Sequence, residues 1–229
     1  MNAGPILDNA ALFAHGTLTT IALLAAALVV GGALAIPLAI VRTSRGRLAS
    51  RTVWAFTYVV RGTPLLVQLF LLYYGLAQFD AVRASVAWPL LKSAWFCAAL
   101  AMAINTCAYT TEMLAGAIRA LPHGEIEAAL AIGMSPSQRL RRIVLPLALR
   151  RSLPAYSNEV VMMLHGTSLA SIVTLMDITG VARDVNARFY LPFESFIAAA
   201  ALYLLLTFAL IAAFRCAEQR WLAPLRARA

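Results

Sequence analysis

The sequence predicts an all-α protein that crosses a membrane several times, through about five transmembrane helices. Of its 229 residues, 62% are hydrophobic and 13% are charged, and the mean hydropathy is +0.78. Soluble domains average roughly 45–50% apolar and about 25% charged residues. Residues 17–41 and 195–214 carry no charged side chain, and each run exceeds the roughly 18 residues that span a bilayer as a helix. We expect residues 1–229 to form a single transmembrane domain.

The apolar runs predict spans at residues 17–41, 63–79, 93–118, 152–176 and 195–214. Lysine and arginine collect on the cytoplasmic side of membrane proteins. Fifteen basic residues lie in the first loop, at Arg61, in a long loop at 119–151 and in the C-terminal tail, against four elsewhere. The sequence therefore predicts an N-terminus outside and a cytoplasmic C-terminus, which an odd number of spans also requires.

Residues 42–62, between the first two spans, are apolar and aromatic, but Arg51 and Arg61 stand too close together to bracket a span. We interpret this segment as an elbow helix in the membrane interface. Thr63 is expected to cap the next helix, and Pro64 suits its first turn, where a missing N–H costs nothing.

Composition and motifs exclude several classes of function. The net charge of +9 is assigned to loops that flank the membrane, and not to nucleic-acid binding. The chain lacks a phosphate-binding loop ending in Gly-Lys-Ser/Thr, and neither HExxH nor GxSxG occurs. Cys97, Cys107 and Cys216 have no metal-ligand spacing. We therefore expect no catalytic residue, metal or cofactor on this chain.

The loop at 119–151 is much longer than a connection between two helices needs, and loops above about 12–15 residues are usually functional. Residues 123–134 are typical of a short helix, with Glu125 and Glu127 in the first turn, where acidic side chains favour the helix dipole. Gly133 is expected to end that helix.

A second helix in this loop is expected to begin with Ser135 as its N-cap and Pro136 at its first position. Pro146 should bend or end it. The resulting helix–glycine–helix unit has two interpretations. It is either a basic hairpin that rests on anionic lipid, or an element that docks into a groove on a partner protein.

The same loop resembles the EAA signature of the permease subunits of ABC importers. The pattern runs Glu127-Ala128-Ala129, three residues, Gly133, nine residues, Ile143, one residue, Leu145-Pro146. Residues 61–69, 105–129 and 153–165 are similar to the polar amino acid branch of that family, in particular to M-type permease subunits of histidine and lysine/arginine/ornithine importers. The resemblance covers roughly residues 15–225.

The resemblance implies the type I ABC importer permease fold in a bacterial inner (cytoplasmic) membrane, and ATP-driven import of basic or polar amino acids by alternating access. It implies three partners: a dimer of ATPase subunits that hold ATP and Mg²⁺, a second homologous permease subunit, and a periplasmic substrate-binding protein. The M-type resemblance favours a heteromeric pair of permease subunits. Hydrolysis belongs to the ATPase, so the chain itself is not expected to be an enzyme. In this family the binding protein usually sets the choice among histidine, arginine, lysine, ornithine and opines.

The family also implies a role for the signature. Residues from Glu127 to Gly133 would dock into a cleft of the ATPase and pass its movement to the spans. The alternative is a stand-alone secondary amino acid transporter. That class uses coupling-ion carboxylates and an internal repeat, and neither half of this sequence mirrors the other.

Two polar residues are expected deep in the membrane. At about 1.5 Å per residue, Glu159 lies about 12 Å beyond Arg151, and Asn105 lies about 20 Å beyond Lys92, near the middle of a roughly 30 Å core. A carboxylate could pair with a substrate's cationic group and an amide could bind its α-carboxylate, and related permeases carry Glu and Asn at the matching positions. Alternatively, Glu159 pairs with Arg61 or another subunit, and Asn105 binds the backbone of its span.

Three other features have a structural and a functional interpretation. Glu112 is expected to form a structural ion pair, with Arg119 or with the first loop, in preference to contacting substrate. His165 is expected to be a satisfied core histidine. Residues 177–194 mix both charge signs, so they are either a solvated loop or a contact for the binding protein.

Overall fold

A computed structural model describes residues 4–226 of the chain, with side chains to residue 221, and all its secondary structure in that range is helical. This confirms the all-α prediction. The helices are α1 (Gly4–Asp8), α2 (Ala10–Thr43), α3 (Arg47–Gly62), α4 (Leu65–Phe70), α5 (Asp80–Arg83), α6 (Trp88–Leu91), α7 (Ala94–Arg119), α8 (His123–Ala131), α9 (Pro136–Arg139), α10 (Leu145–Gly166), α11 (Ile178–Phe189) and α12 (Pro192–Arg226). α4 is continued by a wider turn at Leu71–Gly75 and a tighter turn at Leu76–Gln78. A wider turn at Leu140–Val144 continues α9, and a tighter turn at Thr167–Val173 continues α10.

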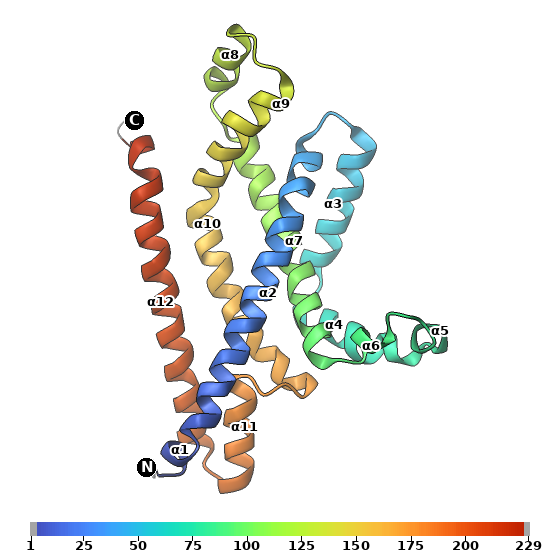
Figure 1. Ribbon diagram of the computed structural model, residues 1–229, viewed down its shortest axis with the longest axis vertical. Coiled ribbons are helices and arrows are strands. Elements are labelled where there is room, and N and C mark those ends of the chain that lie inside the picture. The colour runs from blue at the N-terminus through green and yellow to red at the C-terminus, as the bar shows by residue number, and fades with distance from the viewer. Residues whose placement is uncertain (1–3, 227–229) are drawn as a thin grey trace.

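The long helices α2, α7, α10 and α12 run along the length of the molecule (Figure 1). The centre is α7, which packs against α2, α3 and α10. The approach of α2 to α7 is close, because a Cβ atom on Gly31 would lie 2.6 Å from the carbonyl oxygen of Ala103. This pair is therefore a scaffold on which α3, α10 and α11 pack, while α12 packs on α10 and α11.

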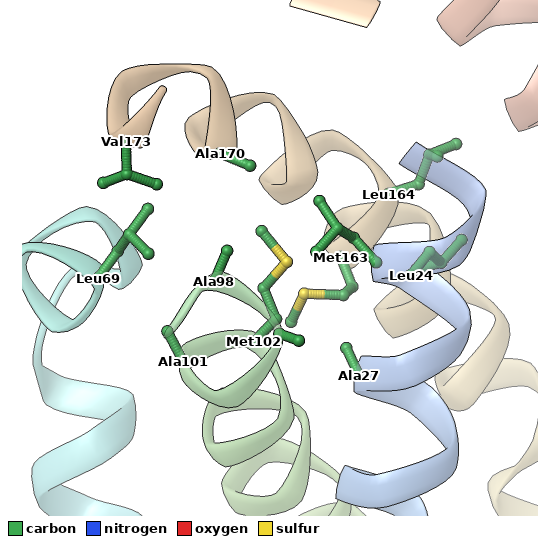
Figure 2. Close-up of a cluster of buried hydrophobic side chains, with 12 residues drawn as sticks. Leu24, Ala27, Leu69, Ala98, Ala101, Met102, Met163, Leu164, Ala170 and Val173 are labelled. Atoms are coloured by element: carbon green, nitrogen blue, oxygen red, sulfur yellow. The ribbon is translucent and has the colours of Figure 1, made fainter. Parts of the chain in front are cut away.

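A cluster of buried apolar side chains joins the scaffold to α4 and α10 (Figure 2). Met102 of α7 and Met163 of α10 meet in its middle, between Ala27 of α2 and Ala98 of α7. Methionine fills irregular gaps of this kind because its side chain is unbranched and flexible. The cluster fixes how α10 sits on α7, and these two helices carry the polar residues expected at membrane depth.

Within the described residues, two helices, α2 and α12, are each long and apolar enough to cross a membrane. Up to four segments qualify if each of two bent pairs counts as one span. α7 has 26 residues, about 39 Å of helix, but it buries Asn105 and three threonines. A helix that its neighbours cover does not need an apolar surface for lipid. The expected number of five spans and their orientation stay predictions.

Residues 42–62 differ from the interfacial elbow expected for them. Residues 42–43 end α2, and residues 47–62 form α3, which lies lengthwise against α2 and α7 (Figure 1). The chain then turns by 100° into Leu65–Gln78. The Thr63 side chain does not cap α4, and Pro64 is the N-cap. The hydroxyl of Thr63 donates instead to the carbonyl oxygen of Val59, 3.1 Å away, so it ends α3.

Pro146 does not end the second helix of the long loop. It stands in the first turn of α10, directly after the wide turn Leu140–Val144. The span expected at 152–176 therefore begins at Leu145, its α-helix ends at Gly166, and a tighter turn continues to Val173. Widening of the preceding turn gives the proline ring the room that a regular helix denies it.

Residues 177–194 are not a solvated loop. They contain α11, whose apolar side packs against α2 and α12, with Ile178, Val181 and Val185 buried. Asp177 begins this helix: it is fully buried, and its carboxylate accepts hydrogen bonds from the N–H of Gly180 (2.9 Å) and from the hydroxyl of Tyr203 (3.1 Å).

The two ends of the molecule differ in the way the charge pattern predicts. The α2–α3 connection, α8, α9 and the C-terminal part of α12 lie at one end, and α1 and α11 lie at the other (Figure 1). The first end carries the arginine-rich segments. The positive-inside rule therefore predicts that α8 and α9 face the cytoplasm.

Candidate functional site

A cavity of about 770 Å³ opens between the joint of α3 and α4, the middle of α7 and the middle of α10. Asn105 of α7 and Glu159 of α10 both line it. The structure thus brings together the two residues that the sequence singled out at membrane depth. The other lining residues are Arg61, Gly62, Thr63, Pro64, Leu65, Tyr109, Asn158, Met162, Met163, His165, Gly166 and Leu169.

Asn105 is 8% exposed, and its amide Nδ2 donates to Oε1 of Gln68 at 3.4 Å. Gln68 in turn donates to the carbonyl oxygen of Val60 (2.7 Å) and to the hydroxyl of Thr63 (2.9 Å). Asn105 is therefore joined by side chains to the α3–α4 joint, and its alternative role of bonding the backbone of its own span is not observed. Sequence reasoning missed Gln68, although an amide inside an apolar span was a usable signal.

Glu159 is half-buried and lines the same cavity as Arg61. Among the described residues it forms no ion pair within 4 Å. The Arg61 guanidinium lies instead over the ring of Tyr109, 5.0 Å from its centroid, a cation–π contact. The alternative Arg61–Glu159 pair is thus not formed, and the cavity keeps one anionic and one cationic group apart.

His165 is not a core histidine, because it is exposed and lines the cavity. Its Nε2 lies 3.2 Å from the hydroxyl of Thr207 on α12. Asn158 and Met162 are also exposed at the rim, and 60% of Met162 is accessible. One side of the cavity is therefore open on this chain.

Glu112 has the structural role expected, with the first loop as its partner. Its carboxylate accepts from Nε of Arg42 and from the hydroxyl of Thr57, both at 2.8 Å. Arg119 donates instead to the backbone oxygen of Arg42, at 3.4 Å. These contacts join α2, α3 and α7 and keep α3 packed against the other two helices.

The long loop folds as the helix–glycine–helix unit that the sequence predicted. Gly133 has φ of +75°, a left-handed conformation that favours glycine. The N–H of Met134 donates to the carbonyl oxygen of Ala129 (3.0 Å), and that of Gly133 donates to Leu130 (2.9 Å). These two bonds form a Schellman motif, in which glycine at the C′ position ends the helix.

The start of α9 is also as predicted. The hydroxyl of Ser135 accepts from the N–H of Gln138, and the Gln138 side chain accepts from the N–H of Ser135, so the two residues form a capping box. Pro136 occupies the first turn. Both ends of the turn between α8 and α9 are thereby fixed.

The signature residues divide between the tip and the base of this unit. Ala129 is buried, whereas Glu127 and Ala128 are exposed on α8. Leu130 and Ile132 are 54% and 76% exposed at the tip. Ile143, Leu145 and Pro146 are half-buried at the base, where the unit joins α10.

Comparison with protein families matches residues 27–222 to the family described as "Binding-protein-dependent transport system inner membrane component". The chain is 49% identical over 208 residues to the histidine/lysine/arginine/ornithine transport system permease protein HisM of Salmonella typhimurium, covering 90% of this chain and 88% of that one. It is 45% identical over 212 residues to the nopaline transport system permease protein NocM of Agrobacterium fabrum, covering 92% and 88%.

Two solved structures are similar along nearly the whole chain. The crystal structure of an amino acid ABC transporter with histidines matches with a TM-score of 0.85 and 29% identity, over 96% of this chain and 99% of that one. An inward-facing MetNI methionine ABC transporter matches with a TM-score of 0.71 and 20% identity, over 91% and 97%. The second likeness concerns the fold alone.

Proposed function

The chain belongs to the family of binding-protein-dependent transport system inner membrane components, and from that premise we propose that it carries cationic amino acids or their opine derivatives through the cavity between α3, α7 and α10. It is a permease subunit of an ABC importer in the inner membrane, and it works with an ATPase and a substrate-binding protein. The observation that carries the proposal is the placement of Glu159 and Asn105 on one cavity.

In this proposal Glu159 binds the cationic end of the substrate. A half-buried carboxylate without an ion-pair partner gains from an incoming ammonium or guanidinium group, because a charge-assisted hydrogen bond contributes about 1.5–3 kcal/mol. Asn105, oriented by Gln68, supplies an amide for the α-carboxylate. A substrate with opposite charges at its two ends would lie between these helices.

We propose that the exposed rim of the cavity faces a second, homologous permease subunit in a heteromer. Arg61 and His165 are exposed there beside Met162. Charged groups at membrane depth usually face a bundle interior or a water-filled path and not lipid. A second permease subunit would close this side and complete the path.

The unit formed by α8 and α9 docks the ATPase in this proposal. Its residues are Glu127, Ala128, Ala129 and Gly133 at the tip, with Ile143, Leu145 and Pro146 at the base. The exposed Leu130 and Ile132 suit a protein groove better than a charged lipid surface. The ATP and Mg²⁺ would be held by the ATPase, and no step of hydrolysis is assigned to this chain.

Transport of arginine and its neutral isostere citrulline by the reconstituted importer tests the substrate proposal. Glu159→Gln should weaken arginine uptake roughly ten- to a hundredfold, the equivalent of the lost charge-assisted bond, and should change citrulline uptake little. Asp8→Asn, an exposed carboxylate on α1 and away from the docking unit, is the matched control. Equal loss for both substrates, or no loss for either, would move recognition of the cation away from Glu159.

A further inference from the structure

We propose that the chain binds one anionic phospholipid of the arginine-rich leaflet between α10 and the C-terminal part of α12. Two adjoining cavities carry this inference. One, of about 370 Å³, is lined by Leu145, Pro146, Leu149, Arg150, Arg220 and Trp221. The other, of about 320 Å³, shares Leu149 and Trp221 with it and continues between α2, α7 and α10.

The first cavity has the chemistry of a phosphate site. Arg150 of α10 and Arg220 of α12 both line it, and neither forms an ion pair within the described part of the chain. The nearest carboxylate in sequence, Glu218, stands two positions from Arg220, and side chains so spaced do not share a helix face. Two unpaired guanidinium groups therefore line a single cavity, where a phosphate can be bound by both.

Trp221 lies between the two cavities and is 56% exposed. Tryptophan favours the level of the lipid headgroups, because its ring is apolar and its N–H is polar. Its place beside the two arginines marks this level on α12. A phosphate at the arginines would thus be level with a residue that suits the boundary between water and hydrocarbon.

The second cavity has the chemistry of a slot for an acyl chain. Its walls are mainly apolar, from Ile36, Leu114, Leu149 and Leu153 among others. It continues along α10 from Leu149 to Tyr156, about 10 Å into the bundle at the helical rise. A lipid whose phosphate binds at the arginines can therefore place a chain in this slot.

The charge pattern decides which lipid fits. Anionic headgroups gain about fivefold in binding for each nearby arginine, whereas a zwitterionic headgroup lacks that gain. Basic pockets between transmembrane helices on the cytoplasmic side are typical sites for such headgroups. Phosphatidylglycerol is thus expected to be retained over phosphatidylcholine by about thirtyfold when both arginines are present.

Native mass spectrometry of the assembled permease–ATPase complex tests the proposal, after release from nanodiscs with equal amounts of phosphatidylglycerol and phosphatidylcholine. The double variant Arg150→Gln/Arg220→Gln should lose the thirtyfold preference. Arg47→Gln, on α3 at the same end of the molecule, is the control and should keep it. Equal retention of phosphatidylglycerol by the double variant and the control would overturn the proposal.

A second pair of variants tests the slot separately from the charge. A Cβ on Gly32 meets only the hydroxyl of Tyr156, at 3.8 Å, so Gly32→Ala leaves the slot open and Gly32→Leu fills it. Gly32→Leu should lower retention of both lipids about tenfold, the loss expected when roughly two methylene groups stay outside, and Gly32→Ala should not. Unchanged retention in Gly32→Leu would overturn the chain placement.

Two further outcomes of the same experiment separate other occupants. If the wild-type complex retains no lipid above the double variant, a helix of another subunit fills the cavities and the lipid proposal is wrong. If millimolar inorganic phosphate displaces the bound phosphatidylglycerol completely, the arginines form a site for a soluble anion and the proposal is equally overturned. Persistence of the lipid in excess phosphate supports it.

Discussion

Replacing Gly133 by alanine should weaken ATPase docking without affecting membrane insertion. Gly133 has φ of +75°, and a Cβ atom added to it would meet no other atom within 4 Å. The cost therefore comes from the backbone alone, about 1–2 kcal/mol for an L-residue in the left-handed region. The substitution therefore destabilises the conformation of α8 that docks into the ATPase. The affinity for the ATPase should fall about five- to thirtyfold.

Gly124→Ala is the matched control, since this glycine lies inside α8 and a Cβ there also meets nothing within 4 Å. Its backbone is helical, so alanine should stabilise α8 by up to about 1 kcal/mol. The assay is titration of the detergent-solubilised permease with labelled ATPase, together with hydrogen exchange at the N–H groups of Gly133 and Met134. Equal affinities for both variants would refute the reasoning from backbone conformation.

Three other predictions concern the scaffold and the topology. Glu112→Gln should lower the free energy of unfolding by about 2–3 kcal/mol in a denaturant titration. This is below the roughly 3–5 kcal/mol lost when a fully buried pair is broken, because Arg42 and Glu112 are 18% and 16% exposed. An unchanged midpoint would show that the cluster does not stabilise the fold. Asp177→Ala removes the N-cap of α11 and should cost about 1–3 kcal/mol, seen as faster hydrogen exchange confined to that helix; unchanged exchange would contradict this. Gly46→Cys and Arg188→Cys should react with an impermeant reagent from opposite faces of the membrane, and labelling from one face would refute the orientation.

The helix–glycine–helix unit formed by α8 and α9 could be predicted from the sequence because its geometry is local. The left-handed turn at Gly133 and the capping box at Ser135 each depend on residues within a few positions. The joint appearance of Asn105 and Glu159 on one cavity could also be anticipated, because depth along a rigid helix follows from residue number.

The environment of those two residues could not be predicted in the same way. Gln68 reaches Asn105 because the chain turns by 100° between α3 and α4, and Arg61 reaches Tyr109 because α3 packs against α7. A turn of that size is fixed by packing on α7 and by the distant contact of Glu112 with Thr57. Contacts between residues far apart in sequence leave no periodic pattern.

One of the two alternatives for residues 177–194, a solvated loop, is wrong for a related reason. Asp184 and Arg188 give the segment a mixed charge, but they form an ion pair at 2.7 Å on one side of α11. The opposite side buries Ile178 and Val181. A short helix with a strongly polar side resembles a solvated loop when only its composition is considered, and its apolar spacing is the better signal.

ATP-dependent uptake of arginine in proteoliposomes tests the central claim most directly. The assembled complex is reconstituted with the binding protein supplied on one side, and uptake is measured with ATP or without it. We predict that uptake requires ATP and the ATPase subunit, and that Gly133→Ala lowers it more than Gly124→Ala does. Uptake by this chain alone, without ATP, would contradict the account and establish a stand-alone secondary transporter.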